Sequence, residues 1–116
     1  MIPGPWTVQM PGFTRLPRQA EKQAWLRVVS NAARPIPRLR SGLVQVHYAP
    51  RWEVNAHDTE GLRRASRWVV AGLVSAGVFV DDLPERVHVP AVHVDAATGQ
   101  PGRWWFTVET KEPARE

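Results

Sequence analysis

The sequence predicts a single α+β domain, in which a small mixed sheet carries two helices packed on one face. The length of 116 residues suits one domain with a modest core. Apolar residues recur at helical spacing in residues 19–33 and 59–76. Strand-like segments lie before, between and after these two stretches. The expected order is therefore β-α-β-α-β-β.

The first eighteen residues predict a short strand followed by a basic loop. Residues 6–10 are mostly apolar or β-favouring, and a Pro-Gly pair then breaks the strand. The loop up to residue 18 carries Arg15 and Arg18.

The first helix is expected from about Gln19 to Ala33. Pro35 and Pro37 end it, because proline lacks the N–H that a helix requires. Its apolar residues are Ala20, Ala24, Trp25, Val28, Val29 and Ala32.

A strand over residues 43–48 and the second helix follow. The strand is predicted by alternation, and the helix begins after Asp58 or Thr59 as N-cap and stops at Gly77. We expect Trp25 and Trp68 in the core rather than as base-stacking platforms. The apolar stripe of the second helix comprises Leu62, Ala65, Val69, Gly72, Leu73 and Ala76.

Two strands are expected near the C-terminus, over residues 87–94 and 103–110. The turn between them, residues 95–102, favours an antiparallel hairpin. Pro90 indicates an edge position or a bulge. Residues 112–116 are expected to be frayed. Because neighbouring residues of a strand point to opposite faces, one tryptophan of the pair at 104 and 105 could be exposed.

Composition excludes several classes of site. The chain has no cysteine, which excludes disulfides, thiolate zinc sites and a cysteine nucleophile. The four histidines are scattered, so a histidine-based zinc site is not expected. No stretch approaches the ~20 apolar residues of a membrane span. The first residues lack the features of a signal peptide, and a cytoplasmic protein without membrane association is expected.

Charge is distributed unevenly. The formal net charge is +4, but residues 1–40 hold seven basic residues and one acid, whereas residues 41–116 hold eight basic and ten acidic residues. This asymmetry is typical of a nucleic-acid binder with a separate acidic site. Most of the basic residues are arginines, which suit bidentate phosphate contact, although a GC-rich genome also enriches arginine.

Acidic residues stand at both ends of the second helix. Asp58 and Glu60 precede or open it, and Asp81 and Asp82 follow it. If the chain folds back, their carboxylates can converge, and such a cluster in a basic protein suggests a divalent metal facing a polyanion. Each pair also has an ordinary structural interpretation, since a helix N-terminus favours acids and a turn favours aspartate.

Five arginines are candidates for contact with DNA phosphates: Arg15, Arg18, Arg63, Arg64 and Arg67. The last three lie on the second helix. A solvated helix face is the alternative interpretation of this run.

Nine residues share the spacing of a known family pattern without any gap: Asp58, Leu62, Gly72, Leu73, Ala76, Gly77, Val78, Asp81 and Asp82. The pattern is Asp-x-Asp-Asn-Leu, a helix with a Lys and an Asp-Gly-Leu, then Ala-Gly-Val and Asp-Asp. The chain thus resembles the RusA-like family of Holliday junction resolvases, especially its short phage-borne members. Segments 36–39, 44–50 and 83–85 are also similar, so the resemblance covers about residues 19–94.

Four positions depart from the pattern. Glu60 replaces the second Asp, Gly61 the Asn, Arg67 the Lys and Ala71 the helix Asp. The chain is therefore interpreted as a divergent member, with residues 1–116 as one RusA-like domain.

The resemblance implies a Mg²⁺- or Mn²⁺-dependent endonuclease that acts as a homodimer on branched DNA in a bacterial or phage-infected cell. Asp58, Glu60 and Asp82 would be the metal ligands, with Asp81 beside them, and Arg67 would be the catalytic cation. Mg²⁺ prefers oxygen ligands, and it activates water and neutralises phosphate charge.

Two other functions stay open at this point. The substitutions between residues 58 and 71 suit a DNA-binding protein that has lost the chemistry. The chain could also be a basic structural or interaction protein that shares only the packing. Convergence of the acidic residues would favour the enzyme over the last alternative, and a cleavage assay would separate the enzyme from the binding protein.

Overall fold

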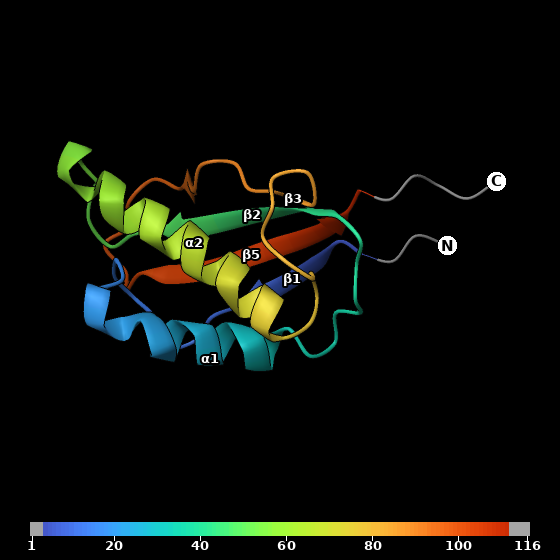
Figure 1. Ribbon diagram of the computed structural model, residues 1–116. Helices are drawn as coiled ribbons and strands as arrows, with labels where there is room; N and C mark the ends of the chain where they lie inside the picture. Colours follow the sequence, from blue (N-terminus) through green and yellow to red (C-terminus); the bar gives the residue numbers. More distant parts are fainter. Residues whose placement is uncertain (1–3, 112–116) are drawn as a thin grey trace.

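The computed structural model describes residues 4–111 as one mixed sheet with two helices across one face (Figure 1). The sheet has the order β1-β5-β2-β3, and β4 pairs with β2 as well. The predicted α+β domain with both helices on one face is confirmed. The expected fraying of residues 112–116 lies outside the described residues.

The last strand in the sequence occupies the middle of the sheet. β5 (Arg103–Thr110) pairs antiparallel with β1 (Trp6–Gln9) on one side and with β2 (Gly42–Ala49) on the other. Beyond β2, the short strands β3 (Val87–His88) and β4 (His93–Val94) form the edge, both parallel to β2.

The predicted hairpin between residues 87–94 and 103–110 is wrong. β5 inserts between β1 and β2 instead, and the residues before it pair with β2. The crossover through the second helix makes parallel pairing with β2 possible, which a short turn does not allow. The single expected strand is split into β3 and β4, and Pro90, which cannot donate to a ladder, lies in the break between them at the edge of the sheet rather than in a strand.

Each helix is preceded by a short 3₁₀ turn. Gln19–Glu21 (η1) leads into α1 (Lys22–Ala32), and Ala56–Asp58 (η2) leads into α2 (Thr59–Ser75). Neither helix within residues 4–111 combines the length and apolar character needed to cross a bilayer.

Gly77 ends α2 as expected. Its φ of 84° is in the left-handed region, which glycine adopts without a steric penalty. The N–H of Gly77 donates to Val74 O at 3.0 Å, and the N–H of Val78 donates to Leu73 O at 3.0 Å. These bonds satisfy carbonyls at the helix end and turn the chain back toward the sheet.

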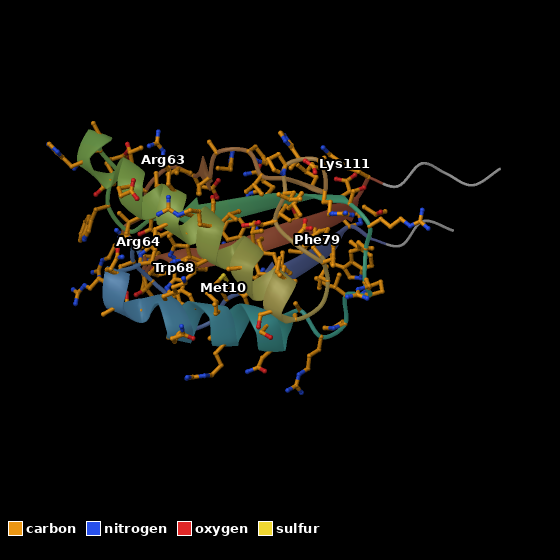
Figure 2. The ribbon with its side chains drawn as sticks, in the orientation of Figure 1. Met10, Arg63, Arg64, Trp68, Phe79 and Lys111 are labelled. Atoms are coloured by element: carbon orange, nitrogen blue, oxygen red, sulfur yellow. The ribbon has the colours of Figure 1, made fainter. Side chains whose placement is uncertain are left out.

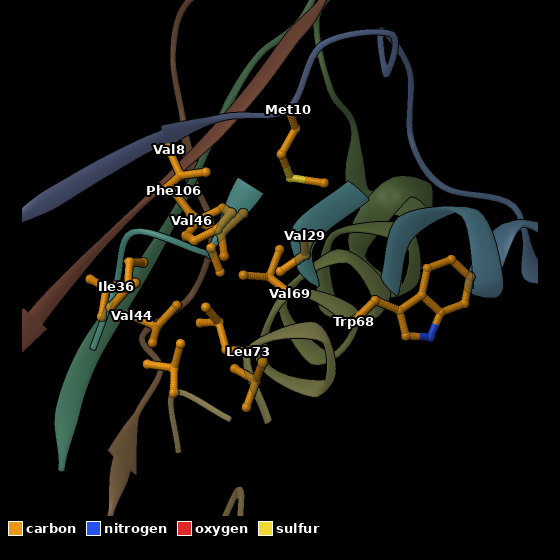
Figure 3. Packing of buried hydrophobic residues seen from close by; sticks show 14 of the residues in the cluster. Val8, Met10, Val29, Ile36, Val44, Val46, Trp68, Val69, Leu73 and Phe106 are labelled. Carbon is orange, nitrogen blue, oxygen red and sulfur yellow. The ribbon is translucent and has the colours of Figure 1, made fainter. Parts of the chain in front are cut away.

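The core lies between the helices and the sheet (Figure 3). Trp25 is fully buried, with its ring centroid 4.8 Å from that of Phe13, 6.2 Å from Trp68 and 5.1 Å from Trp104. The placement of Trp25 and Trp68 in the core is confirmed. Of the expected apolar stripe on α2, Ala76 is exposed, because the helix ends one residue earlier.

Candidate nucleic-acid interface and acidic residues

An open groove runs along α2 and has a volume of about 710 Å³. Residues from Thr59 to Ala71 on α2 form one wall, and residues 89–92 contribute to the lining. The charged side chains that line it are Lys22, Arg63, Arg67 and Asp82. Three cations therefore face one carboxylate in this groove, which we call the α2 groove.

Arg63 and Arg64 lie next to each other on α2 but serve different purposes (Figure 2). Arg63 is exposed and lines the α2 groove. The Nη1 of Arg64 instead donates to Pro17 O at 3.1 Å, and its guanidinium lies 5.9 Å from the centroid of the Trp68 ring. The Arg64 side chain thus links the basic loop to α2. Of these two arginines, Arg63 is the one whose guanidinium can contact a phosphate.

Glu21 organises the basic loop that contains Arg15 and Arg18. Its two carboxylate oxygens accept hydrogen bonds from both terminal nitrogens of Arg15, each at 2.9 Å, and Oε1 also accepts from the backbone N–H of Arg18 at 2.7 Å. The bond from Arg15 lowers the pKa of Glu21 and raises the pKa of Arg15. Arg15 is therefore committed to an exposed ion pair, whereas the Arg18 side chain is exposed without an ion pair to residues 4–111.

Asp58 is the last residue of the 3₁₀ turn before α2 and completes the capping box whose N-cap is Asn55. Its Oδ2 accepts from the N–H of Asn55 at 2.8 Å, and Asn55 Oδ1 accepts from the N–H of His57 at 2.8 Å. Asp58 occupies the N-cap position of α2, as expected, but its side chain makes no capping bond to that helix because it bonds back to Asn55. It lines a second hollow of about 450 Å³, together with Tyr48 and Trp52.

The other three acidic residues of the predicted metal site, Glu60, Asp81 and Asp82, lie in three different environments. Glu60 Oε1 accepts from Nη2 of Arg67 at 3.1 Å, and this bond lowers the pKa of Glu60. Asp81 Oδ1 lies 3.2 Å from Nε of Arg86 and accepts from a backbone N–H in the following turn. Asp82 lines the α2 groove, as does Arg67.

The structure does not bring the predicted metal ligands together. Within residues 4–111, no three Asp, Glu or His side chains lie close enough to share an ion. Asp58 lines the second hollow, whereas Asp82 lines the α2 groove. The fold does bring Arg67 together with Glu60 by a hydrogen bond and with Asp82 in one groove. Metal binding by this set stays a prediction.

A row of polar and aromatic side chains on the sheet was not anticipated from the sequence. The rings of His47 and Trp105, which are directly paired across β2 and β5, stack at 5.1 Å with 4° between their planes. The guanidinium of Arg103 lies 5.1 Å from the centroid of the Trp105 ring, and His93 Nε2 lies 3.1 Å from Asp95 Oδ1. Burial, followed by the charge of His93, lowers the pKa of His47. The β2–β5 register, which the sequence alone does not provide, was needed to find this row.

Trp52 is the second feature that sequence reasoning missed. It stands in the loop between β2 and η2 and is largely exposed. A single tryptophan in a loop forms no hydrophobic pattern from which its exposure could be predicted, although the charged residues on either side of it are consistent with exposure.

Comparison with known proteins does not assign the chain to a family. No protein-family model matches the chain, and no curated protein matches its sequence. A functional proposal therefore depends on the residues described above and on the motif spacing.

Proposed function

We propose that the chain binds DNA along the α2 groove and that branched DNA is its preferred form. The observation that carries this proposal is the excess of cations in one open groove, which within residues 4–111 is lined by Lys22, Arg63 and Arg67 and by one acidic residue, Asp82. Contacts from lysine and arginine to phosphates supply most of the affinity of proteins for DNA.

The dimensions of the groove suit a nucleic-acid backbone. Its α2 wall extends from Thr59 to Ala71, a rise of about 18 Å at 1.5 Å per residue. Along the axis of a B-form duplex each strand carries a phosphate about every 3.4 Å, so a duplex lying parallel to this wall places roughly five base pairs beside it. Arg67 is paired with Glu60, but both side chains are exposed, and phosphate can replace the carboxylate at little cost.

The preference for branched DNA and a homodimeric state come from the resemblance to RusA-like resolvases. A two-fold dimer presents two identical grooves, which matches a four-way junction with paired arms. Sedimentation at several protein concentrations tests the dimer independently of DNA.

Binding is tested by fluorescence anisotropy with a labelled four-way junction and a linear duplex of the same sequence. The double variant Arg63→Ala/Arg67→Ala should bind more weakly, and the slope of log K against log salt should fall by about 0.9 for each phosphate that the variant no longer neutralises. Arg27→Ala/Arg34→Ala is the matched control, because it removes the same charge from two exposed positions outside the groove, one on α1 and one just after it. An equal reduction of affinity in both double variants would contradict a role for the groove.

A second candidate function is a Mg²⁺-dependent endonuclease acting on the same branched DNA. It is favoured by the presence of an acid and a cation, Asp82 and Arg67, in one groove. Carboxylates are the ligands that Mg²⁺ prefers, but Asp58, Glu60 and Asp81 make other contacts in this structure and do not fit one ion together with Asp82. We therefore derive no catalytic step from this geometry.

A cleavage assay separates the two candidates. Wild-type protein is incubated with an end-labelled four-way junction and Mg²⁺ or Mn²⁺, with linear duplex as the control. Cutting of the junction that disappears in Asp82→Asn would support the endonuclease. Junctions that are bound but left intact in both metals would support a binding protein.

A further inference from the structure

Trp52 is the most exposed large hydrophobic side chain in residues 4–111, with 70% of its surface accessible. Tryptophan is usually highly buried, because its ring system contributes more to the core than that of any other residue. An exposed indole on a basic protein is therefore a candidate contact for a flat ligand.

The loop that carries Trp52 is held in place on both sides. Before it, Pro50 is buried, and the carbonyls of Pro50 and Arg51 accept hydrogen bonds from Thr98 N at 3.3 Å and Gly99 N at 3.1 Å. After it, Asn55 forms the capping box with Asp58. The indole is thus presented outward by a fixed backbone, which reduces the entropy lost when a ligand binds.

Cationic and hydrogen-bonding groups surround the indole. The guanidinium of Arg51 lies 5.1 Å from the centroid of the Trp52 ring, and Arg51 forms no ion pair with a residue in 4–111. The hollow beneath is lined also by Arg15, Glu53 and Asp58. It therefore offers an aromatic face, an available cation and two carboxylate acceptors.

We propose that Trp52 stacks on an unpaired base of DNA, with Arg51 contacting the adjacent phosphate. Aromatic side chains stack on any base, and arginine adds a cation–π contribution and phosphate contact. The carboxylates of Glu53 and Asp58 can accept hydrogen bonds from the exocyclic amino group of a base. An intact duplex hides its base faces, whereas single strands and branch points expose them, so this contact gives the protein a means to select non-duplex DNA.

This inference rests on the proposed DNA binding and adds the structural feature that is recognised. The probes are a single strand, a four-way junction and a linear duplex, each labelled, at one salt concentration. A further single strand carries 2-aminopurine, whose fluorescence falls when it stacks. The variants are Trp52→Ala and Trp52→Phe, and Leu83→Ala is the control that truncates another exposed apolar side chain.

Trp52→Ala should weaken binding to the single strand and the junction by roughly 5- to 150-fold, the range expected for one base–aromatic stack. It should leave duplex binding and the thermal midpoint close to wild type, because the side chain is exposed. Trp52→Phe should retain most of the affinity and the 2-aminopurine quenching, and Leu83→Ala should behave as wild type.

Three different results would overturn the inference. If all variants bind every DNA as wild type does, the DNA-binding proposal survives and the contact of Trp52 with a base is refuted. If wild type binds none of the probes, the proposed function itself fails and the inference fails with it. An equal weakening for duplex and single strand would also refute base stacking.

Discussion

The contact between α1 and α2 at Gly72 provides a quantitative test of the packing. An added Cβ at Gly72 would lie 2.6 Å from Cβ and Cγ1 of Val29, about 1 Å closer than carbon atoms approach at their optimum. Replacing glycine by alanine inside a helix favours folding by about 1 kcal/mol. Overpacking a tight core costs typically ~1–3 kcal/mol. The clashing atoms include Val29 Cβ, which is fixed to the backbone of a buried helix residue, so we expect a cost in the upper part of that range, about 2–3 kcal/mol. The net destabilisation of Gly72→Ala is then about 1–2 kcal/mol.

Gly61 supplies a matched control in the same helix. Its added Cβ would lie 3.4 Å from Cβ of Leu16, near ordinary contact, so Gly61→Ala should leave stability unchanged or raise it by up to about 1 kcal/mol. Urea and thermal unfolding followed by circular dichroism measure both variants. Gly72→Ala should lower the thermal midpoint by roughly 4–8 °C. A Gly72→Ala protein as stable as Gly61→Ala would refute the close approach of the two helices. Because α2 forms one wall of the α2 groove, a displaced helix should also weaken DNA binding.

Three further predictions concern the charged residues. DNA affinity should fall steeply with added salt, and Arg63→Ala should reduce the salt slope by about 0.9 in a titration; a binding constant insensitive to salt would count against any role in DNA binding. If the protein cuts junctions, Asp82→Asn should abolish cutting while junction binding persists. The double variant Glu60→Asp/Arg67→Lys, which introduces the residues of the RusA-like pattern that the chain resembles, should then raise the cleavage rate. Folding lowers the pKa of Glu21 below its ordinary value of 4.5, so its ion pair stabilises the protein above that pH and ceases to do so as the pH falls through the lowered pKa. Glu21→Gln should therefore have a lower thermal midpoint than wild type at pH 7, and the difference should disappear as the pH falls below the lowered pKa of Glu21. A difference that stays constant with pH would show that the charge is not responsible.

The elements could be predicted from local patterns because local chemistry determines them. The alternation in β2 and the apolar spacing in α2 reflect which side chains the sheet and helix bury. Gly77 ends its helix through a backbone conformation that glycine favours. These features depend on neighbours in the sequence.

Strand pairing and the acidic site depend on distant residues. The pairing of β5 with β1 joins residues about a hundred positions apart, and the local turn at residues 95–102 pointed to a nearer partner. Likewise, the spacing of Asp58 and Asp82 could not reveal that one side chain would bond back to Asn55 and the other would line the α2 groove. The exposure of Trp52 depends on the backbone hydrogen bonds between its loop and residues 98–99, which no sequence pattern predicts.

The central place of β5 has a consequence for how the chain folds during synthesis. β1 and β2 are joined in the sheet only through β5, which leaves the ribosome after both of them. Until residues 103–110 emerge, both strands keep an open edge that can pair with another chain. The many contacts between distant parts of the sequence should also make folding slower than in a helical domain of this size. The nascent chain is therefore most exposed to aggregation just before β5 closes the sheet.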